Sequence, residues 1–285
     1  MSQRQLTSPI FSVVTPSFNM LNYLRRCHAS IADQGTSTEH IIVDALSSDG
    51  TADWMREQGD VVAIIERDRG MYDAVNKGLR RSRGAIVSYL NCDEQYLPET
   101  LQVVHEYFRM HPRTDVVFGD ALLINPDGSL IAYRKGYAPR WPYIVASHLY
   151  VLSCTMFMRR RVIEEGFFFD EGWRDIGDHE FVVRLLRRGF RAAHIPRYLA
   201  AFTITGNNMS AGDNAKLETL RARRAAPRWV RALRAPLNAL RYAEKAASGA
   251  YWQRFPLKYH VYATAEDRMR TSVTAMRAPS SWPKG

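Results

Sequence analysis

The sequence predicts an α/β protein with a mostly parallel central sheet that helices cover on both faces. Short apolar runs, rich in β-branched residues, recur through the first hundred or so residues. Segments with apolar residues at helical spacing alternate with these runs. Strands that are apolar throughout are buried on both faces, which is typical of parallel sheets between helical layers.

The first part of the chain predicts four strands, and each of them ends in polar or turn-forming residues. The strands cover 10–15, 40–43, 61–65 and 85–90. Helical spacing of apolar residues follows them, in segments that begin near residues 21, 51, 72 and 98.

The strand–helix alternation loosens after a further apolar run at 116–118. Residues 122–131 predict a hairpin, because Asn-Pro-Asp-Gly stands at the centre of this stretch. Residues 134–143 are rich in aromatic residues and proline and are interpreted as a loop. Asp178 begins a helix, and Gly189 ends it.

Charge divides the chain into two parts. Residues 216–285 contain 15 Lys or Arg and 4 Asp or Glu, whereas the preceding part contains 24 and 25 and is close to neutral. We therefore expect a main domain over 8–212 and a basic, mainly helical extension over 213–285.

Composition also limits the compartment. Cys27, Cys92 and Cys154 are scattered without a CxxC pair, which favours a reducing compartment over a disulfide framework or a zinc ribbon. The polar segment 1–9 lacks the apolar core of a signal peptide, and the sequence has no apolar run long enough for a transmembrane helix. We expect a cytoplasmic protein that is at most peripheral on the inner membrane.

The polar residues that end the strand 85–90 indicate chemistry. Asn91, Asp93 and Glu94 would reach the carboxyl edge of the sheet, where α/β proteins bind ligands. Oxygen ligands at such an edge suit a hard divalent cation, and that cation suits a diphosphate.

Four segments in order carry a family resemblance: FSVVTPSFNMLNYL, HIIVDALSSDGT, ERDRGMYDAVNKGL and GAIVSYLNCDEQYLPETL. Over residues 10–105, and more loosely to about 210, the chain resembles the family 2 glycosyltransferases with a GT-A fold. The resemblance implies inverting transfer of a sugar from a UDP-, GDP- or dTDP-sugar to a hydroxyl of a glycan or lipid-linked acceptor. It also implies a Mn²⁺ or Mg²⁺ cofactor and a role in exopolysaccharide, capsule or lipopolysaccharide biosynthesis.

The same resemblance assigns roles at the strand end 91–94. Asp93 matches the metal-ligating acid of the family's Asp-x-Asp motif. Asn91 replaces the first acid of that motif, and its side chain would bind ribose or metal. Cys92 fills the middle position and is interpreted as packing within the nucleotide-sugar site. Glu94 is a neighbouring acid whose contact with the metal stays open.

The remaining nucleotide-sugar residues lie at earlier strand ends. Asp44 is expected to bind the base or ribose, with a local turn as the alternative. Asp68 matches the acid of the Asp-x-Gly-x-Tyr-Asp signature, and Arg69 has the fork geometry that suits a diphosphate. The predicted set is completed by Pro16, Phe18 and Asn76.

Asp178 is predicted to be the general base that deprotonates the acceptor. It matches the family's late acid, although a plain helix cap explains it as well. Asp175 and Glu180 are rivals for the same role. The resemblance also suggests that 207–210 close over the donor, and Trp141 and Trp173 are candidates for stacking on sugar rings.

The extension contains a basic amphipathic segment over 229–240. Such a segment suits an anionic membrane surface, and the alternative is a helix packed on the domain with a solvated basic face. Pro227 and Pro236 are expected to break it into short pieces. Its predicted apolar face is formed by Trp229, Leu233, Leu237 and Leu240, and its basic face by Arg228, Arg231, Arg234 and Arg241.

Two other functions are weaker fits. A sugar-nucleotide pyrophosphorylase resembles a glycine-rich loop after the first strand, and residues 16–19 contain no glycine. Binding of a nucleic acid through the arginines of the extension lacks a recognised reading motif, and the main domain has no positive surplus. We therefore expect no specific nucleic-acid partner.

Overall fold

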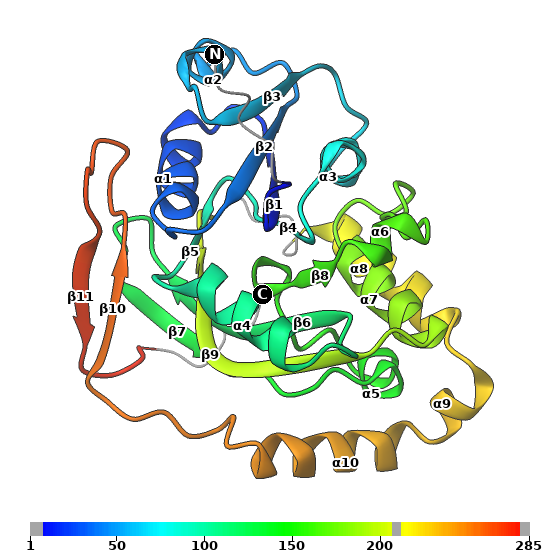
Figure 1. Cartoon of the computed structure of the whole chain (residues 1–285). Helices are drawn as coiled ribbons and strands as arrows, with labels where there is room; N and C mark the ends of the chain where they lie inside the picture. The colour runs from blue at the N-terminus through cyan, green and yellow to red at the C-terminus, as the bar shows by residue number, and fades with distance from the viewer. Residues whose placement is uncertain (1–7, 207–211, 280–285) are drawn as a thin grey trace.

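A computed structural model describes residues 8–206 and 212–279 and shows an α/β fold built on one large sheet (Figure 1). Within these residues the sheet has nine strands in the order β3-β2-β1-β4-β8-β6-β9-β5, and β7 pairs with β6 off this path. No helix in the described part of the chain is long and apolar enough to cross a membrane.

The first half of the sheet is parallel, as predicted. It consists of β1 (Phe11–Ser17), β2 (Thr38–Asp44), β3 (Val61–Ile65) and β4 (Ile86–Tyr89). Residues Ser17 and Asp44 are register partners at the ends of β1 and β2. The carboxyl ends of these strands therefore form one edge, and we call this edge, with the residues that directly follow the strands, the carboxyl rim.

The second half of the sheet is mixed rather than mostly parallel. It contains β5 (Glu94–Tyr96), β6 (Val116–Ile124), β7 (Leu130–Arg134), β8 (Phe157–Arg159) and β9 (Ala192–Thr203). Strand β6 runs parallel to β9, but β8 is antiparallel to both β4 and β6, and β5 is antiparallel to β9. The predicted hairpin is confirmed as β6 and β7, joined by a turn in which the Gly128 N–H donates to the Asn125 carbonyl.

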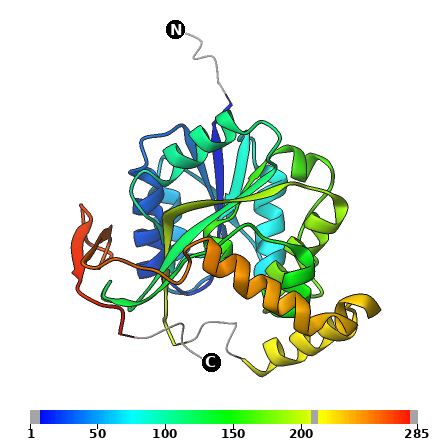
Figure 2. The same ribbon diagram turned by 90° about the horizontal axis from the view of Figure 1, so that it is seen from below.

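Helices cover both faces of the sheet (Figure 2). Adjacent residues of β1 face opposite layers: Val13 belongs to the apolar core beneath α1 and α4, and Val14 to the core beneath α3 and α7. This alternation explains why the strands are apolar throughout. The helices of the main domain are α1 (Leu21–Ala32), α2 (Thr51–Glu57), α3 (Met71–Arg81), α4 (Thr100–Met110), α5 (Trp141–Ala146), α6 (Arg161–Glu164) and α7 (Gly177–Arg188).

The C-terminal extension packs on the main domain. Its helices α8 (Asp213–Arg224), α9 (Arg228–Ala232) and α10 (Arg234–Ala247) contact α5. A two-stranded sheet of β10 (Leu257–Val261) and β11 (Thr271–Ala275) follows. The sequence reading did not predict these two strands.

Two details of the predicted amphipathic segment need correction. The helix break falls at Leu233, and Pro236 lies inside the first turn of α10, where its missing N–H has no intrahelical partner to lose. Arg241 does not belong to a solvated basic face, because it is only 3% exposed and contacts Tyr137 and Asn238. The predicted apolar face is largely turned to solvent: Trp229, Leu233 and Leu240 are all exposed.

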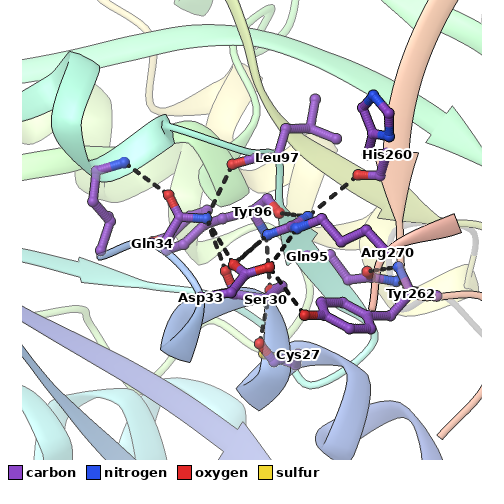
Figure 3. Close-up of polar contacts among 11 residues, drawn as sticks. Cys27, Ser30, Asp33, Gln34, Gln95, Tyr96, Leu97, His260, Tyr262 and Arg270 are labelled. Carbon is purple, nitrogen blue, oxygen red and sulfur yellow. Dashed lines mark hydrogen bonds and ion pairs between the residues drawn. The ribbon is translucent and has the colours of Figure 1, made fainter. Parts of the chain in front are cut away.

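One arginine anchors the strand pair β10–β11 to α1 and β5 (Figure 3). The Arg270 guanidinium donates to both carboxylate oxygens of Asp33, at 2.6 and 2.7 Å. It also donates to the main-chain carbonyls of Ser30, Tyr96 and His260. We call this set of contacts the Arg270 clasp.

Candidate active site

The strand end after β4 presents oxygen atoms without partners. The Glu94 side chain is 1% exposed, and one of its oxygens accepts the Asn91 N–H at 2.8 Å. Its other oxygen Oε1 and the Asn91 oxygen Oδ1 are buried, and neither has a hydrogen bond among the described residues. Buried polar atoms are normally paired, so these oxygens are suited to a ligand.

Asp93 is half-buried and open to a ligand. Its carboxylate has no hydrogen bond or ion pair with another residue in the ranges that the structure describes. Burial raises the pKa of Asp93 to about 6. Burial, with a smaller contribution from Asp93, raises the pKa of Glu94 well above its usual value.

Asp178 lies in the first turn of α7, within electrostatic reach of the same group. Burial raises its pKa to about 6, and its own charge contributes to the raised pKa of Glu94. Its main-chain N–H donates to the Tyr72 hydroxyl at 3.1 Å, and its carboxylate accepts the N–H of His179. The structure thus brings Asp93, Glu94 and Asp178 together from two elements far apart in the sequence.

The two rivals for the base are already engaged. The Glu180 carboxylate accepts two hydrogen bonds from Arg184, at 2.7 and 3.1 Å. The Asp175 carboxylate accepts a hydrogen bond from the Asn214 amide. Among the described residues, Asp178 is the one of these three acids whose carboxylate accepts no hydrogen bond from a side chain.

Aromatic packing fixes the start of α7 against α3. The Tyr72 ring stacks on Phe169 at 5.1 Å, and Phe169 stacks on Phe181 at 4.0 Å. A Cβ atom on Gly177 would lie 2.5 Å from the Tyr72 ring, so only glycine fits there. Tyr72 is therefore a packing residue in this arrangement.

A carboxylate that the sequence reading missed holds the loop before Asp178. Glu218 of α8 is buried and accepts the main-chain N–H groups of three consecutive residues at 2.7, 3.0 and 3.0 Å. These hydrogen bonds lower its pKa against the opposing effect of burial. The donors are Arg174, Asp175 and Ile176. No sequence motif marked Glu218, because its burial and its three main-chain donors depend on the packing of α8 against the loop before α7.

At the ends of β1 and β2 the rim combines a buried acid with exposed apolar side chains. Asp44 is fully buried, and its carboxylate accepts the Ser47 N–H and hydroxyl at 2.9 and 2.5 Å. That is the local turn that the sequence left open, so its contact with a nucleotide stays a prediction. Phe18 is 59% exposed and Leu46 is 51% exposed. Leu46 also has a left-handed φ of 64°, a strained conformation that is typical of functional loops.

Pro16 and Cys92 occupy packed positions. Pro16 lies inside β1, where it is the register partner of Val43. Cys92 packs with Leu24 and Met55, and burial raises the pKa of its thiol well above the usual value. These contacts agree with the interpretation of Cys92 as a packing residue.

The loop between β3 and α3 carries Asp68 and Arg69. The Asp68 carboxylate caps the following turn by accepting the Gly70 N–H at 3.0 Å, and burial raises its pKa. The Arg69 guanidinium pairs with Asp73 and Glu171. A role of Arg69 at a diphosphate stays a prediction, because it would have to exchange these carboxylate partners.

Asn76 has a structural task in this arrangement. It is 1% exposed, and its amide makes hydrogen bonds with the N–H and carbonyl of Phe169 and with Glu171. The same packing that places α3 against α7 therefore uses every polar atom of its side chain. Residues 207–210, predicted to close over the donor, lie outside the described residues.

The two candidate sugar-stacking tryptophans lie near the extension. Trp173 is buried beneath the Arg221 guanidinium, at 4.3 Å from the ring centroid. Trp141 meets the edge of Trp229 of α9 at 5.3 Å. Neither contact tests a role at a sugar ring.

The donor atoms at the rim fit a hard cation that is shared with a ligand. In the described part of the chain, no group of three His, Cys, Asp or Glu side chains is arranged to hold a metal by itself. Magnesium is usually held by one or two carboxylates together with substrate phosphates, rather than by a complete protein cage. Asp93, with the unpaired oxygens of Asn91 and Glu94 beside it, has that chemistry.

Comparisons with known proteins agree with this geometry. A family model described as "Glycosyl transferase family 2" matches residues 12–168, more than half of the chain. A teichuronic acid biosynthesis glycosyltransferase, TuaG of Bacillus subtilis, is 28% identical over 71% of this chain and 82% of its own length. A PGL/p-HBAD biosynthesis glycosyltransferase of Mycobacterium bovis is 31% identical, over 41% of this chain and 49% of its own length.

Solved structures show the same fold. The crystal structure of S. aureus TarS in complex with UDP-GlcNAc has a TM-score of 0.61 at 17% identity and covers 92% of this chain and 99% of that one. The mannosyltransferase PcManGT of Pyrobaculum calidifontis, in complex with GDP-Man and Mn²⁺, has a TM-score of 0.58 at 17% identity, over 88% of this chain and 77% of that one. The predicted GT-A fold is confirmed, and the chain belongs to glycosyl transferase family 2 and is a glycosyltransferase.

Proposed function

We propose that the protein is an inverting, metal-dependent glycosyltransferase that uses Asp178 as its base. The observation that carries the proposal is the group formed by Asp93, Glu94 and Asp178, in which one carboxylate is open and the pKa values are raised by burial. Perturbed acids that converge at the edge of an α/β sheet are a recognised sign of an active site.

In this proposal the two half-buried acids, Asp93 and Asp178, act on different parts of the reaction. Asp178 takes the proton of the acceptor hydroxyl, and the oxygen forms a bond to the anomeric carbon. The bond from that carbon to the diphosphate breaks on the opposite face, and its electron pair leaves with the nucleoside diphosphate. Attack from the face opposite the leaving group inverts the anomeric configuration.

Asp93 would hold the divalent cation, with the Asn91 and Glu94 oxygens beside it. When bound, Mn²⁺ or Mg²⁺ would neutralise charge that develops on the departing diphosphate. Support for this assignment is the open Asp93 carboxylate and the Mn²⁺ in the complex of the structurally similar PcManGT.

The donor is a nucleotide-diphosphate sugar, bound across the ends of β1 and β2. The exposed Phe18 ring offers a surface for a nucleotide base, and Asp44, Asp68 and Arg69 lie in the adjoining turns. Structural neighbours bind UDP-GlcNAc, UDP and GDP-Man, so UDP-, GDP- and dTDP-sugars are the donors to screen. The acceptor is a glycan or a lipid-linked glycan of the cell envelope, in keeping with the biosynthetic pathways named for TuaG and the mycobacterial relative.

Two isosteric variants test the assignment. With Mn²⁺ and the best donor of the screen, Asp93→Asn should weaken metal-dependent donor binding by at least tenfold and abolish transfer. Asp178→Asn should lower the rate of transfer by about 10²–10⁴-fold and leave donor binding within about twofold, because the base acts only on the acceptor. Full transfer by Asp178→Asn would exclude it as the base. Metal-independent donor binding by the unmodified protein would exclude the cation site.

We infer that the extension attaches the enzyme to the cytoplasmic face of the membrane as a peripheral protein. Eight of the thirteen exposed large apolar side chains in the described residues fall between Leu217 and Trp252, and that stretch is also rich in arginine. Exposed apolar side chains among cations are the composition of an interfacial segment.

A flotation assay tests the membrane assignment. The protein should float with vesicles of phosphatidylglycerol, and much less with phosphatidylcholine. The double variant Trp229→Glu with Leu233→Glu should stay at the bottom of the gradient. The matched control is Met110→Glu, because Met110 is 69% exposed but lies on α4. Equal flotation of the double variant and the control would refute the assignment.

A further inference from the structure

A pocket rich in arginine opens on the main domain, away from the carboxyl rim. Its volume is about 390 Å³, within the usual range of small-molecule sites. Four of its lining residues are arginines, Arg113, Arg159, Arg161 and Arg191, and one is an acid, Asp115. We call this space the arginine pocket.

The strand register places the arginine pocket at the amino edge of the sheet. Arg159 is the register partner of Ile86, the first residue of β4. Val116, the first residue of β6, pairs with Ala192, the first residue of β9. The pocket therefore lies at the amino ends of β4, β6 and β9, whereas the carboxyl rim is the opposite edge of the sheet.

The helix α7 connects the two edges. Its first turn contains Asp178, and its C-cap residue Gly189 lines the arginine pocket. The twelve residues of α7 rise by about 1.5 Å each, or about 18 Å in all. A small anion in the pocket is therefore out of contact with the acids of the rim, and the pocket is a site of its own.

Two of the arginines form a fixed wall of the pocket. Asp115 is only 1% exposed, and its carboxylate accepts hydrogen bonds from Arg161 Nε at 2.6 Å and from the Arg191 main-chain N–H at 2.8 Å. The Arg159 guanidinium donates to three main-chain carbonyls between residues 108 and 114. These contacts exist without a ligand, so the wall is preorganised and little ordering is left for binding to supply.

The other two arginines have unoccupied guanidinium groups. Arg113 and Arg191 are exposed, and neither side chain has a hydrogen bond or ion pair with another residue in the described ranges. Each lies three residues beyond the last residue of a helix, Met110 of α4 or Arg188 of α7. The effect of a helix dipole falls off within the last turn. Neither a carboxylate nor a helix end therefore accounts for these two arginines.

The lining of the pocket has a surplus of three positive charges, because four guanidinium groups face the single carboxylate of Asp115. The surplus is local, since the 24 basic and 25 acidic residues of 1–215 nearly cancel. Cations held near one another repel, and an anion between them removes that repulsion. The planar guanidinium matches the oxygen atoms of a phosphate group in particular.

We propose that the arginine pocket binds an anion that carries a phosphate group, at a site separate from that of the sugar donor. Arg113 and Arg191 hold the phosphate oxygens, and Arg159 and Arg161 form the fixed wall behind them. The bound anion joins the loop after α4 to the loop after α7 and stabilises the native state by mass action. A free phosphate compound and a lipid headgroup share this chemistry. The inference goes beyond the proposed function and does not rest on it.

Calorimetric titration with inorganic pyrophosphate tests the site. The buffer contains EDTA, because without a divalent cation the acids of the rim repel an anion. The unmodified protein should bind pyrophosphate, and its melting temperature should rise with the pyrophosphate concentration. The double variant Arg113→Ser with Arg191→Ser should bind at least tenfold more weakly. Its melting temperature without ligand verifies that it is folded, since the two side chains have no partner among the described residues to lose.

A matched control separates the pocket from general charge attraction. The double variant Arg81→Ser with Arg109→Ser removes the same charge from two exposed arginines. They lie in the last turns of α3 and α4, near the same edge of the sheet but outside the pocket. This control should bind pyrophosphate within about twofold of the unmodified protein. Absence of pyrophosphate binding, or an equal loss in the pocket variant and the control, would overturn the proposal.

Flotation with vesicles of phosphatidate and phosphatidylcholine distinguishes the two sources of the phosphate group. The protein carries Trp229→Glu and Leu233→Glu in this assay, so that the extension does not supply the attachment. Flotation that disappears on addition of Arg113→Ser and Arg191→Ser assigns the pocket to a lipid headgroup. Flotation that is absent, or that survives these two substitutions, assigns the pyrophosphate-binding pocket to a free anion.

Discussion

The carboxyl rim and the Arg270 clasp meet on one short strand, β5, but they differ in whether their buried polar atoms have hydrogen-bond partners. At the start of β5, Glu94 leaves one buried oxygen without a partner, and so does the neighbouring Asn91. Two residues along, the carbonyl of Tyr96 accepts a hydrogen bond from Arg270 at 2.7 Å (Figure 3). The Arg270 guanidinium makes five such contacts, and Tyr262 adds a hydrogen bond to Asp33.

This difference indicates that the Arg270 clasp contributes to the stability of the fold and that the rim contributes to ligand binding and chemistry. A saturated network stabilises the native state, because no buried group loses its water without replacement. A rim with raised acid pKa values and open oxygens costs stability and keeps ligand sites available. The comparison therefore predicts that variants at the two places change different measured quantities.

The largest effect is expected at the rim, from Asp178→Asn. Loss of a general base lowers kcat by about 10²–10⁴-fold. Stability should move the other way: the folded pKa of about 6 lies above the usual value, so the ionised form is disfavoured by folding. The stability that the protonated group contributes at low pH is lost as the pH rises toward 6. At pH 7 the neutral amide should therefore raise the melting temperature while the rate of transfer falls, and a lower melting temperature would contradict the comparison.

The clasp should show the reverse pattern in Asp33→Ala. Removal of this carboxylate leaves Arg270, which is 9% exposed, without its charged partner. We expect the free energy of unfolding to fall by about 2–3 kcal/mol in a denaturant titration. At 25 °C, kcat should change less than about threefold, because within the described residues neither Asp33 nor Arg270 has a hydrogen bond or ion pair with any of the three acids.

An exposed ion pair provides the control for the clasp. Asp53 and Arg56 are 82% and 61% exposed, and Asp53→Ala should cost less than about 1 kcal/mol. A loss of kcat in Asp33→Ala as large as that in Asp178→Asn would show that the clasp and the rim are one functional unit.

The sequence predicted the parts of the fold that depend on local patterns. The strands β1 to β4, the β6–β7 hairpin and the bounds of α7 follow from apolar periodicity and from turn and cap residues. The pairing of β8 and β5 was not predictable in this way. These are three-residue strands whose antiparallel partners, β4 and β9, lie about 70 and 100 residues away along the chain. A strand of three residues is too short to show an apolar periodicity of its own.

The residues of the candidate site were also predicted only in part. The resemblance marked Asp93 and Asp178, and the structure places both in one electrostatic group. The resemblance could not predict contacts between distant segments. Arg241 was expected on a solvated face although it is buried, and no motif identified Glu218. Both residues lie in the extension, whose packing against α5 and the α7 loop only the tertiary structure reveals.

Glu218→Gln tests the comparison at a residue of both kinds. Its carboxylate is fully hydrogen-bonded, and its partners position the start of α7. Its two oxygens accept three main-chain N–H groups immediately before α7, and the amide can replace only one oxygen. We expect kcat to fall by about tenfold with KM for the donor nearly unchanged, since the start of α7 loses its position. Glu218→Asp should recover part of that loss. A variant that unfolds more easily but keeps kcat would mark Glu218 as part of the stabilising network instead.

The smallest effect concerns pH. If Asp178 is the base, kcat/KM for the acceptor should be constant above pH 7 and fall by about twofold at pH 6, because half of the carboxylates are then protonated. Below that point the activity should drop tenfold for each pH unit. Saturating Mn²⁺ keeps Asp93, whose pKa is also raised to about 6, in its ionised form during the measurement. The residual activity of Asp178→Asn should lack this acidic limb. If the acidic limb persists in the variant, another residue of the rim is the titrating group, and Asp178 is not the base.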